Sequence, residues 1–398
     1  MPRTRAAAPT TPALDIDELI ADPATHIVVC CGSGGVGKTT TAAAIALRGA
    51  EAGRRVVVLT IDPARRLAQA LGLEELDNTP RPVELPGPAG GSLDAMMLDM
   101  KRTFDEVVQA HAAPDKAEQI LANPFYQAVS SSFAGTQEYM AMERLGQLHA
   151  QRRDGADGAP TWDLIVVDTP PSRSALDFLD APQRLGSFLD GRFVRLLSAP
   201  ARAGGRAYLK VFSAGVNVVT NTLTKVLGGQ LLRDVQTFVA ALDTVFGGFR
   251  KRADQTYALL QQNGTAFVVV AVPEHDALRE AAYFVDRLDE DGMPLAGLVL
   301  NRVRVPAVPS LSAGRALAAA EALEELEPSD TSATTGVTAA LLRLHADLAQ
   351  AAARHQALAR RFSSAHPGVP VVQVPAAAED IHDLTGLRSM GAALAGGD

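Results

Sequence analysis

A glycine-rich stretch between two apolar segments constrains this chain more than any other feature. Residues 30–41 read CCGSGGVGKTTT and follow the apolar run at 26–29. Within this stretch, the segment from Gly32 to Thr39 fits the pattern G-x-x-x-x-G-K-[ST]. Loops of this kind join a strand to a helix and turn consecutive backbone N–H groups toward phosphate oxygens. The stretch therefore predicts an α/β fold with a phosphate-binding loop; the alternative is a plain strand–turn–helix connection.

Short apolar runs recur along the chain, and polar residues follow most of them. The runs lie at residues 26–31, 55–62, 94–100, 164–171, 266–274, 295–301 and 369–375. Their valine and isoleucine content is typical of strands buried on both faces. Helical stretches separate them, as at 39–52 and 276–290. This alternation predicts a doubly wound, mostly parallel sheet of the P-loop NTPase type, with ligands bound beyond the carboxyl ends of the strands.

Two long intervals, 101–160 and 174–263, read as mostly helical and interrupt the alternation. We expect them to form a helical subdomain inserted into one ATPase-like domain that spans residues 25–398. Residues 1–24, rich in Ala, Pro and Thr at their start, are expected to be a disordered lead-in. The alanine-rich stretch 337–362 predicts one long helix.

Composition excludes several function classes. The net charge is −8, from 37 basic and 45 acidic residues, and no extended Lys/Arg cluster occurs, so we expect no nucleic-acid partner. No signal peptide or membrane-spanning run is present, which favours a cytoplasmic protein with at most transient membrane association. The two cysteines, Cys30 and Cys31, are adjacent and read as buried core residues of a reducing compartment.

The glycine-rich loop predicts the contacts of a bound ATP or ADP. Its backbone and side chains supply the candidate nucleotide-binding residues, namely Gly34, Gly35, Val36, Gly37, Lys38, Thr39 and Thr40. Lys38 would place its charge between the β- and γ-phosphates, as a catalytic residue, and the Thr39 hydroxyl would bind Mg²⁺.

Two aspartates at strand ends complete the candidate site. Asp168 follows four apolar residues, which is typical of an aspartate that holds Mg²⁺ through water. Asp62 ends another strand and would orient the attacking water and contribute to the metal site. The alternatives are a surface turn for Asp168 and a loop cap before Pro63 for Asp62.

Three segments together resemble one family. GSGGVGKTT (32–40), IDPARRLAQAL (61–71) and DTPPSRSALDFL (168–179) are similar to the motifs of the deviant-Walker-A ATPases. The branch resembled is the family of the arsenite-pump ATPase (ArsA) and the tail-anchored-protein-targeting (guided-entry) ATPase, and within it the paired actinobacterial members. The resemblance implies that Asn301 reads adenine and that Pro375 belongs to a loop, 374–384, that closes over the base.

The resemblance also implies a nucleotide-switched dimer. Members of this family dimerise face to face over two nucleotides, ATP closes the dimer, and hydrolysis opens it. Asp62 would then lie in one switch segment and Asp168 in the other. No zinc is expected, because NRVRVPAVPS (301–310) stands where the targeting enzymes carry a C-x-x-C pair. A thiolate site for arsenite is not expected either.

Ser33 departs from the family pattern. The signature lysine of the family occupies this position and reaches the partner's phosphates, as an arginine finger does. A serine cannot supply that charge, so we expect the partner to be a homologous subunit that keeps the lysine. The alternatives are a homodimer in which Arg65 or Arg173 substitutes, and a weakly active regulatory ATP-binding subunit.

A hydrophobic client or membrane-associated partner is the remaining expectation. One apolar helix face in the second helical interval predicts a client groove, formed by Phe212, Val216, Val219, Leu223 and Leu227. The alternative is an ordinary core helix. A MinD/ParA-like positioning ATPase is a further alternative, disfavoured by the glycine-rich acidic tail 385–398. A dinucleotide-binding dehydrogenase fits the loop least.

Overall fold

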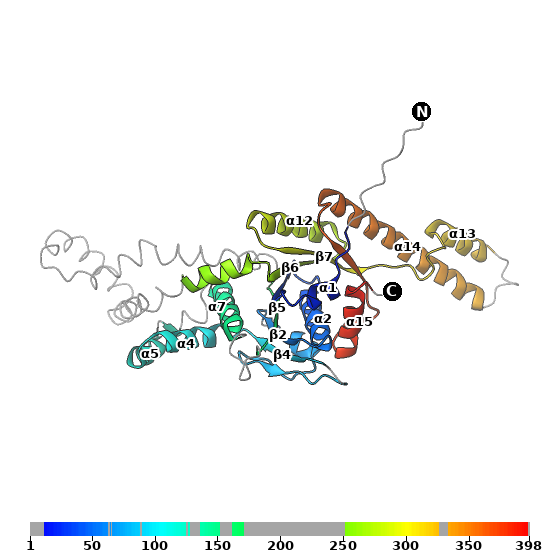
Figure 1. Ribbon diagram of the computed structural model, residues 1–398. Coiled ribbons are helices and arrows are strands. Elements are labelled where there is room, and N and C mark those ends of the chain that lie inside the picture. The colour runs from blue at the N-terminus through cyan, green and yellow to red at the C-terminus, as the bar shows by residue number, and fades with distance from the viewer. Residues whose placement is uncertain are drawn as a thin grey trace, which may run out of the picture.

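A mostly parallel sheet forms the centre of the described part of the fold. The computed structural model describes residues 12–62, 64, 66–87, 90–124, 126, 127, 136–151, 161–170, 251–325 and 333–396. Within them, one eight-stranded sheet has the order β3-β4-β2-β5-β1-β6-β7-β8 (Figure 1). The strands are β1 (Ile27–Gly32), β2 (Arg55–Thr60), β3 (Arg81–Pro82), β4 (Ser92–Met97), β5 (Leu164–Asp168), β6 (Thr265–Ala271), β7 (Leu295–Val303) and β8 (Val371–Pro375).

Strand directions confirm the predicted doubly wound α/β sheet. Every neighbouring pair is parallel except the short β3 with β4. The central strands β1, β5 and β6 are buried along their whole length. Successive side chains face opposite sides of a strand, so Ile27 and Val29 join one core while Val28 and Cys30 join the other. Such strands need apolar residues at every position, which explains their valine-rich runs.

Helices cover both faces of the sheet. One face carries α2 (Lys38–Glu51) and α15 (Leu384–Leu394), which contact each other. The other face carries α12 (His275–Glu290), whose buried Phe284 joins the core beneath it. The helices α4 (Met100–His111) and α7 (Thr136–Gln151) contribute to that same core. Helices therefore cover both faces of the sheet, so a ligand would bind at the carboxyl ends of the strands, where polar residues lie.

The lead-in prediction is wrong for residues 12–24. They include α1 (Ile16–Ala21), whose first turn is capped by Asp15, which accepts a hydrogen bond of 3.0 Å from the Glu18 backbone N–H. Ile16 and Ile20, one helical turn apart, are 0% and 1% exposed. This buried pair anchors the segment to the core. Residues 1–11 lie outside the described part of the chain.

Helix α15 covers most of the glycine-rich stretch 385–398 near the end of the chain. Asp383 caps α15 by accepting a hydrogen bond of 2.7 Å from the Gly386 backbone N–H. Leu387, Met390 and Leu394 are buried on the side of α15 that joins the core of α2. The segment therefore completes one layer of the domain.

Helices dominate the described residues of the intervals that we expected to be helical. The first interval contains α4, α5 (Pro114–Leu121) and α7, and of the second only 251–263 is described, helical over 251–260. The long helix predicted at 337–362 is present as α14 (Ala333–Ala365), which packs along α13 (Ala313–Glu324). No helix within the described ranges is long and apolar enough to cross a bilayer.

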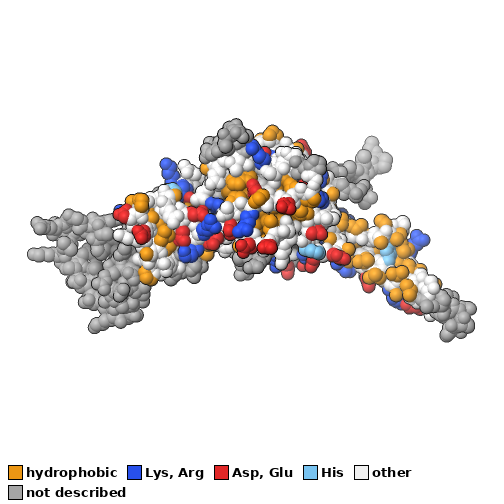
Figure 2. All heavy atoms as spheres, turned by 90° about the horizontal axis from the view of Figure 1, so that it is seen from below, with side chains coloured by type: hydrophobic (Ala, Val, Ile, Leu, Met, Phe, Trp, Pro, Cys, Tyr) orange, Lys and Arg blue, Asp and Glu red, His pale blue; other side chains and the backbone are white. Residues whose placement is uncertain are grey.

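The surface carries mixed charge rather than a basic stripe on the face shown in Figure 2. Blue and red side chains lie interspersed over the centre of that face, while apolar side chains gather on the right-hand arm. That arm is the α13–α14 pair (Figure 1). Val337, Leu341 and Leu344 of α14 are exposed.

Candidate functional site

The glycine-rich loop runs from the end of β1 to the start of α2, as its pattern predicts. Gly35 and Gly37 have φ angles of 78° and 97°, in the left-handed region that favours glycine. Gly37 is also the residue that precedes the first turn of α2. The first N–H groups of a helix have no partner within the helix and carry its positive end. The loop therefore provides the setting in which an anion binds.

Lys38 lies inside this loop. Its side chain is largely buried, with 7% of the residue exposed, and its Nζ atom donates a hydrogen bond of 2.8 Å to the carbonyl oxygen of Ser33. Burial lowers the pKa of Lys38, and the neighbouring Asp168 acts in the opposite direction. The Lys38 side chain is thus held against the backbone of its own loop.

Asp168 ends β5 beside both β1 and β2. The register pairs it with Cys30 on one side and with Thr60 on the other. Its Oδ2 atom accepts a hydrogen bond of 2.8 Å from the Thr60 hydroxyl. Burial raises the pKa of Asp168 to about 6, against the effect of the Thr39 and Thr60 hydroxyls. The Oδ1 atom is buried and has no hydrogen-bond partner among the described residues.

Asp62 lies two residues beyond the end of β2. Its backbone N–H donates to the Thr60 hydroxyl at 3.2 Å, and its Oδ1 atom accepts from the Ala64 N–H at 3.0 Å. Thr60 therefore contacts both aspartates, a role that no sequence motif signalled. In these contacts Asp62 acts as a loop cap, which leaves its second carboxylate oxygen for another ligand.

The donor set fits Mg²⁺, which prefers oxygen ligands and keeps several waters. Asp168 offers a buried carboxylate oxygen that has no partner among the described residues, and Thr39 offers a hydroxyl close to it. Within the described ranges no three His, Cys, Asp or Glu side chains form a metal-binding group. The described residues thus supply part of a Mg²⁺ shell, as in sites where phosphate and water provide the remaining ligands.

The two residues expected at the base occupy different positions. Asn301, near the end of β7, is 7% exposed and donates a hydrogen bond of 2.9 Å from Nδ2 to the carbonyl oxygen of Val36. The structure thus brings Asn301 against the phosphate-binding loop. Pro375 is exposed at the end of β8, next to Val303 of β7. Thr40 lies half-buried in the first turn of α2.

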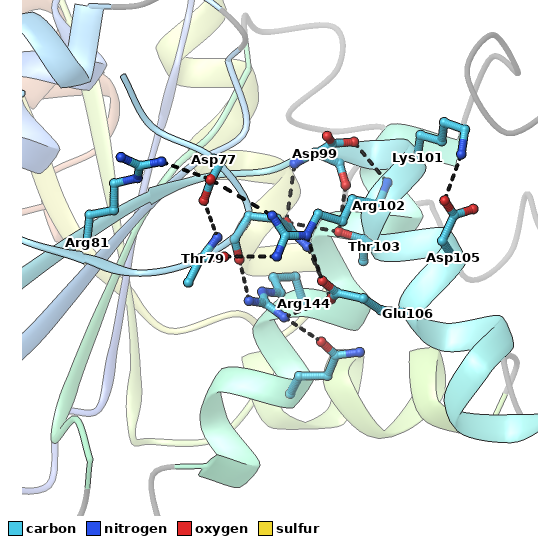
Figure 3. Close-up of polar contacts among 12 residues, drawn as sticks. Asp77, Thr79, Arg81, Asp99, Lys101, Arg102, Thr103, Asp105, Glu106 and Arg144 are labelled. Carbon is cyan, nitrogen blue, oxygen red and sulfur yellow. Dashed lines mark hydrogen bonds and ion pairs between the residues drawn. The ribbon is translucent and has the colours of Figure 1, made fainter. Parts of the chain in front are cut away.

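Helix α7 connects the segment beside Asp62 to the helical region. The Gln137 side chain donates a hydrogen bond of 2.8 Å to the carbonyl oxygen of Ile61. Two turns later, Arg144 donates to the carbonyl oxygen of Asn78 at 2.5 Å and to Glu106 of α4 at 3.3 Å, within the polar network shown in Figure 3. These contacts join residues far apart in sequence, so no local pattern indicated them.

Ser33 turns its hydroxyl into the protein. The Oγ atom is buried and has no partner among the described residues, while the carbonyl group accepts the bond from Lys38. The five residues of the expected client groove and the alternative cations Arg65 and Arg173 lie outside the described part of the chain.

The sequence matches proteins of one family. The sequence model of the anion-transporting ATPases matches residues 25–312. The chain is 25% identical over 275 residues to the ATPase ASNA1 homolog of Cryptosporidium parvum, covering 69% of this chain and 64% of that protein. It is 31% identical over 190 residues to protein Rv2184c of Mycobacterium tuberculosis, covering 43% and 40%.

A third relative is the ATPase GET3 of Malassezia globosa, to which the chain is 25% identical over 281 residues, covering 70% of this chain and 73% of that protein. The match spans less than two thirds of the first two relatives. The family match covers the phosphate-binding loop, both aspartates and Asn301. This chain therefore belongs to the anion-transporting ATPase family.

Proposed function

We propose that the protein binds Mg-ATP and hydrolyses it to ADP and phosphate, and that the bound nucleotide switches its conformation. The observation that carries this proposal is the convergence of Lys38, Thr39 and Asp168 at the carboxyl ends of β1 and β5. The family name and the names of the relatives point to the same chemistry.

Each residue of the site has a distinct task in this proposal. The loop N–H groups and Lys38 bind the phosphates and offset their negative charge. Thr39 and Asp168 hold Mg²⁺, which when bound neutralises charge on the β- and γ-phosphates. Asp62 orients the attacking water with the carboxylate oxygen that does not cap the loop. The chemistry is therefore mostly positioning and charge stabilisation.

Ser33 supports a partnership with a homologous subunit. A serine side chain carries no charge, so it offers no cation to a second nucleotide site, and the Ser33 hydroxyl is also buried. A partner that carries lysine at this position would complete the site of this chain, whereas Ser33 would leave the partner's site without its cation. The same observation favours a second candidate, a regulatory subunit that binds ATP and turns it over slowly.

The contacts of helix α7 support a coupling between the nucleotide site and the helices outside the sheet. Gln137 contacts the backbone beside Asp62, and Arg144 on the same helix contacts α4. A movement of Asp62 on hydrolysis would therefore be transmitted to helices outside the sheet. By resemblance to the family, the readout is a hydrophobic client or a membrane-associated partner, bound in one nucleotide state and released in the other.

Single-turnover ATP hydrolysis tests the proposal. The chain is measured alone and then mixed with a homologous subunit that carries the signature lysine. The heterodimer account expects slow turnover alone and a rate at least ~10-fold higher in the mixture. Ordinary turnover by the chain alone overturns the heterodimer, and unchanged slow turnover in the mixture favours the regulatory subunit. Absence of nucleotide binding in every sample overturns the proposed function.

A further inference from the structure

The hydrogen bond between Asn301 and Val36 gives Asn301 a task in the phosphate-binding loop itself. It joins residues 265 positions apart, and it is buried. The Asn301 Oδ1 atom in turn accepts a hydrogen bond of 2.9 Å from the Arg302 backbone N–H. Both ends of the carboxamide are thus used within the protein, and one N–H of Nδ2 and one lone pair of Oδ1 are left for a ligand.

The backbone around Asn301 is shaped to make this contact. Arg302 has a φ angle of 59°, the only positive value for a residue other than glycine within the described ranges. The pairing of β7 with β8 shifts its register between Leu300 and Val303, which brackets Asn301. Irregularities of this kind re-aim a side chain near functional sites. Here the side chain is directed across the sheet to the loop after β1.

The loop is shaped to receive Asn301. A Cβ atom on Gly37 would lie 2.3 Å from Asn301 Nδ2, which is shorter than the distances that Cβ atoms keep from other atoms in proteins. Gly37 is therefore required both for its φ angle of 97° and for the space that the carboxamide occupies. A glycine in such a loop supplies backbone freedom, and here Gly37 also leaves room for the side chain of Asn301.

The contact fixes the direction of one N–H group of the loop. In a planar trans peptide, the carbonyl of one residue and the N–H of the next point in opposite directions. Because Asn301 holds the Val36 carbonyl on its own side, the Gly37 N–H is directed away from Asn301. We propose that Asn301 is a positioning residue of the phosphate-binding loop, which presents the Gly37 N–H to a phosphate independently of any contact with the base.

This inference rests on the proposed nucleotide site and is tested with a ligand that has no base. Binding of Mg-ATP and of Mg-tripolyphosphate is measured by calorimetry for the full chain and for two variants, Asn301→Ala and Asn301→Asp. The aspartate is isosteric but cannot donate to the Val36 carbonyl. Gln373→Ala is the matched control, since Gln373 is an exposed carboxamide of β8 that bonds Gln356 instead.

We expect both variants to bind tripolyphosphate about tenfold more weakly, and ATP more weakly by at least the same factor. The control should bind both ligands like the parent. Hydrogen exchange of the peptide that contains residues 32–38 should rise in the variants, with the remainder of the domain unchanged. Weaker binding of ATP together with unchanged binding of tripolyphosphate would overturn the inference. If the parent protein binds neither ligand, the proposed function fails instead.

Discussion

The ammonium group of Lys38 donates a hydrogen bond of 2.8 Å to the carbonyl oxygen of Ser33, five residues earlier in the chain. Lys38 of the phosphate-binding loop is therefore hydrogen-bonded to Ser33, the position at which the family motif has a lysine. The backbone carbonyl of Ser33 binds the lysine, while the Ser33 hydroxyl is buried.

Restoring the missing cation should raise the activity of the chain alone. We predict that Ser33→Lys increases single-turnover ATP hydrolysis by at least ~10-fold, because a cation from a second subunit stabilises charge in phosphoryl transfer. Ser33→Ala is the matched control, and it should hydrolyse ATP like the parent because Ser33 Oγ makes no hydrogen bond within the described residues. An unchanged rate for Ser33→Lys would mean that this position supplies no catalytic charge.

Replacing Asp168 by asparagine should raise the free energy of unfolding and weaken the effect of Mg²⁺. Burial raises the pKa of Asp168 to about 6, whereas an unfolded chain titrates at about 3.9. The bound proton thus stabilises the folded protein below pH ~4, and this stabilisation is lost as the pH rises through about 6. At pH 7, Asp168→Asn should raise the free energy of unfolding by about 2 kcal/mol, and at pH ~4 by much less.

Urea denaturation at the two pH values, with and without Mg-ATP, checks this expectation. Mg-ATP should stabilise the variant against urea less than it stabilises the parent, since the amide replaces a carboxylate ligand of Mg²⁺. Retention of the Thr60 hydrogen bond is expected because the amide oxygen still accepts. A variant that is less stable than the parent at pH 7 would contradict the account.

The Arg144 contacts should contribute more to stability than neighbouring surface ion pairs. Arg144 is 8% exposed, and its truncation would leave the Asn78 carbonyl without this donor. We predict that Arg144→Ala lowers the free energy of unfolding by about 2–3 kcal/mol. Arg102→Ala is the control, because the Arg102 side chain also bonds Glu106 but is 48% exposed, and its loss should cost at most about 1 kcal/mol. Equal effects in urea denaturation would show that the buried network has no special role.

Local patterns predicted the sheet and the loop because their signals are contiguous in sequence. Valine-rich runs indicated the buried strands, and the loop motif fixed where β1 ends and α2 begins. The polar contacts around the site could not be predicted in this way. Thr60 contacts Asp168 across 108 residues, and Gln137 reaches Ile61 across 76. Such contacts depend on which strands and helices become neighbours, and that depends on the whole topology.

The error near the N-terminus has a physical reason as well. Composition suggested disorder near the N-terminus, yet one cap at Asp15 and two isoleucines one turn apart suffice to fix α1 against the core. Helix α15 is held against the core in the same way, by the buried residues Leu387, Met390 and Leu394. Short segments like these are stabilised by packing rather than by propensity.

Calorimetric titration of ATP and ADP, in the presence of Mg²⁺, into the parent protein and Lys38→Ala tests the central claim most directly. Lys101→Ala serves as the control, because Lys101 is an exposed lysine paired with Asp105. The account predicts that the parent and the control bind nucleotide, and that Lys38→Ala binds it about 100-fold more weakly while its melting temperature is retained. A parent protein that takes up neither ATP nor ADP, or a Lys38→Ala variant that binds them like the parent, would contradict it.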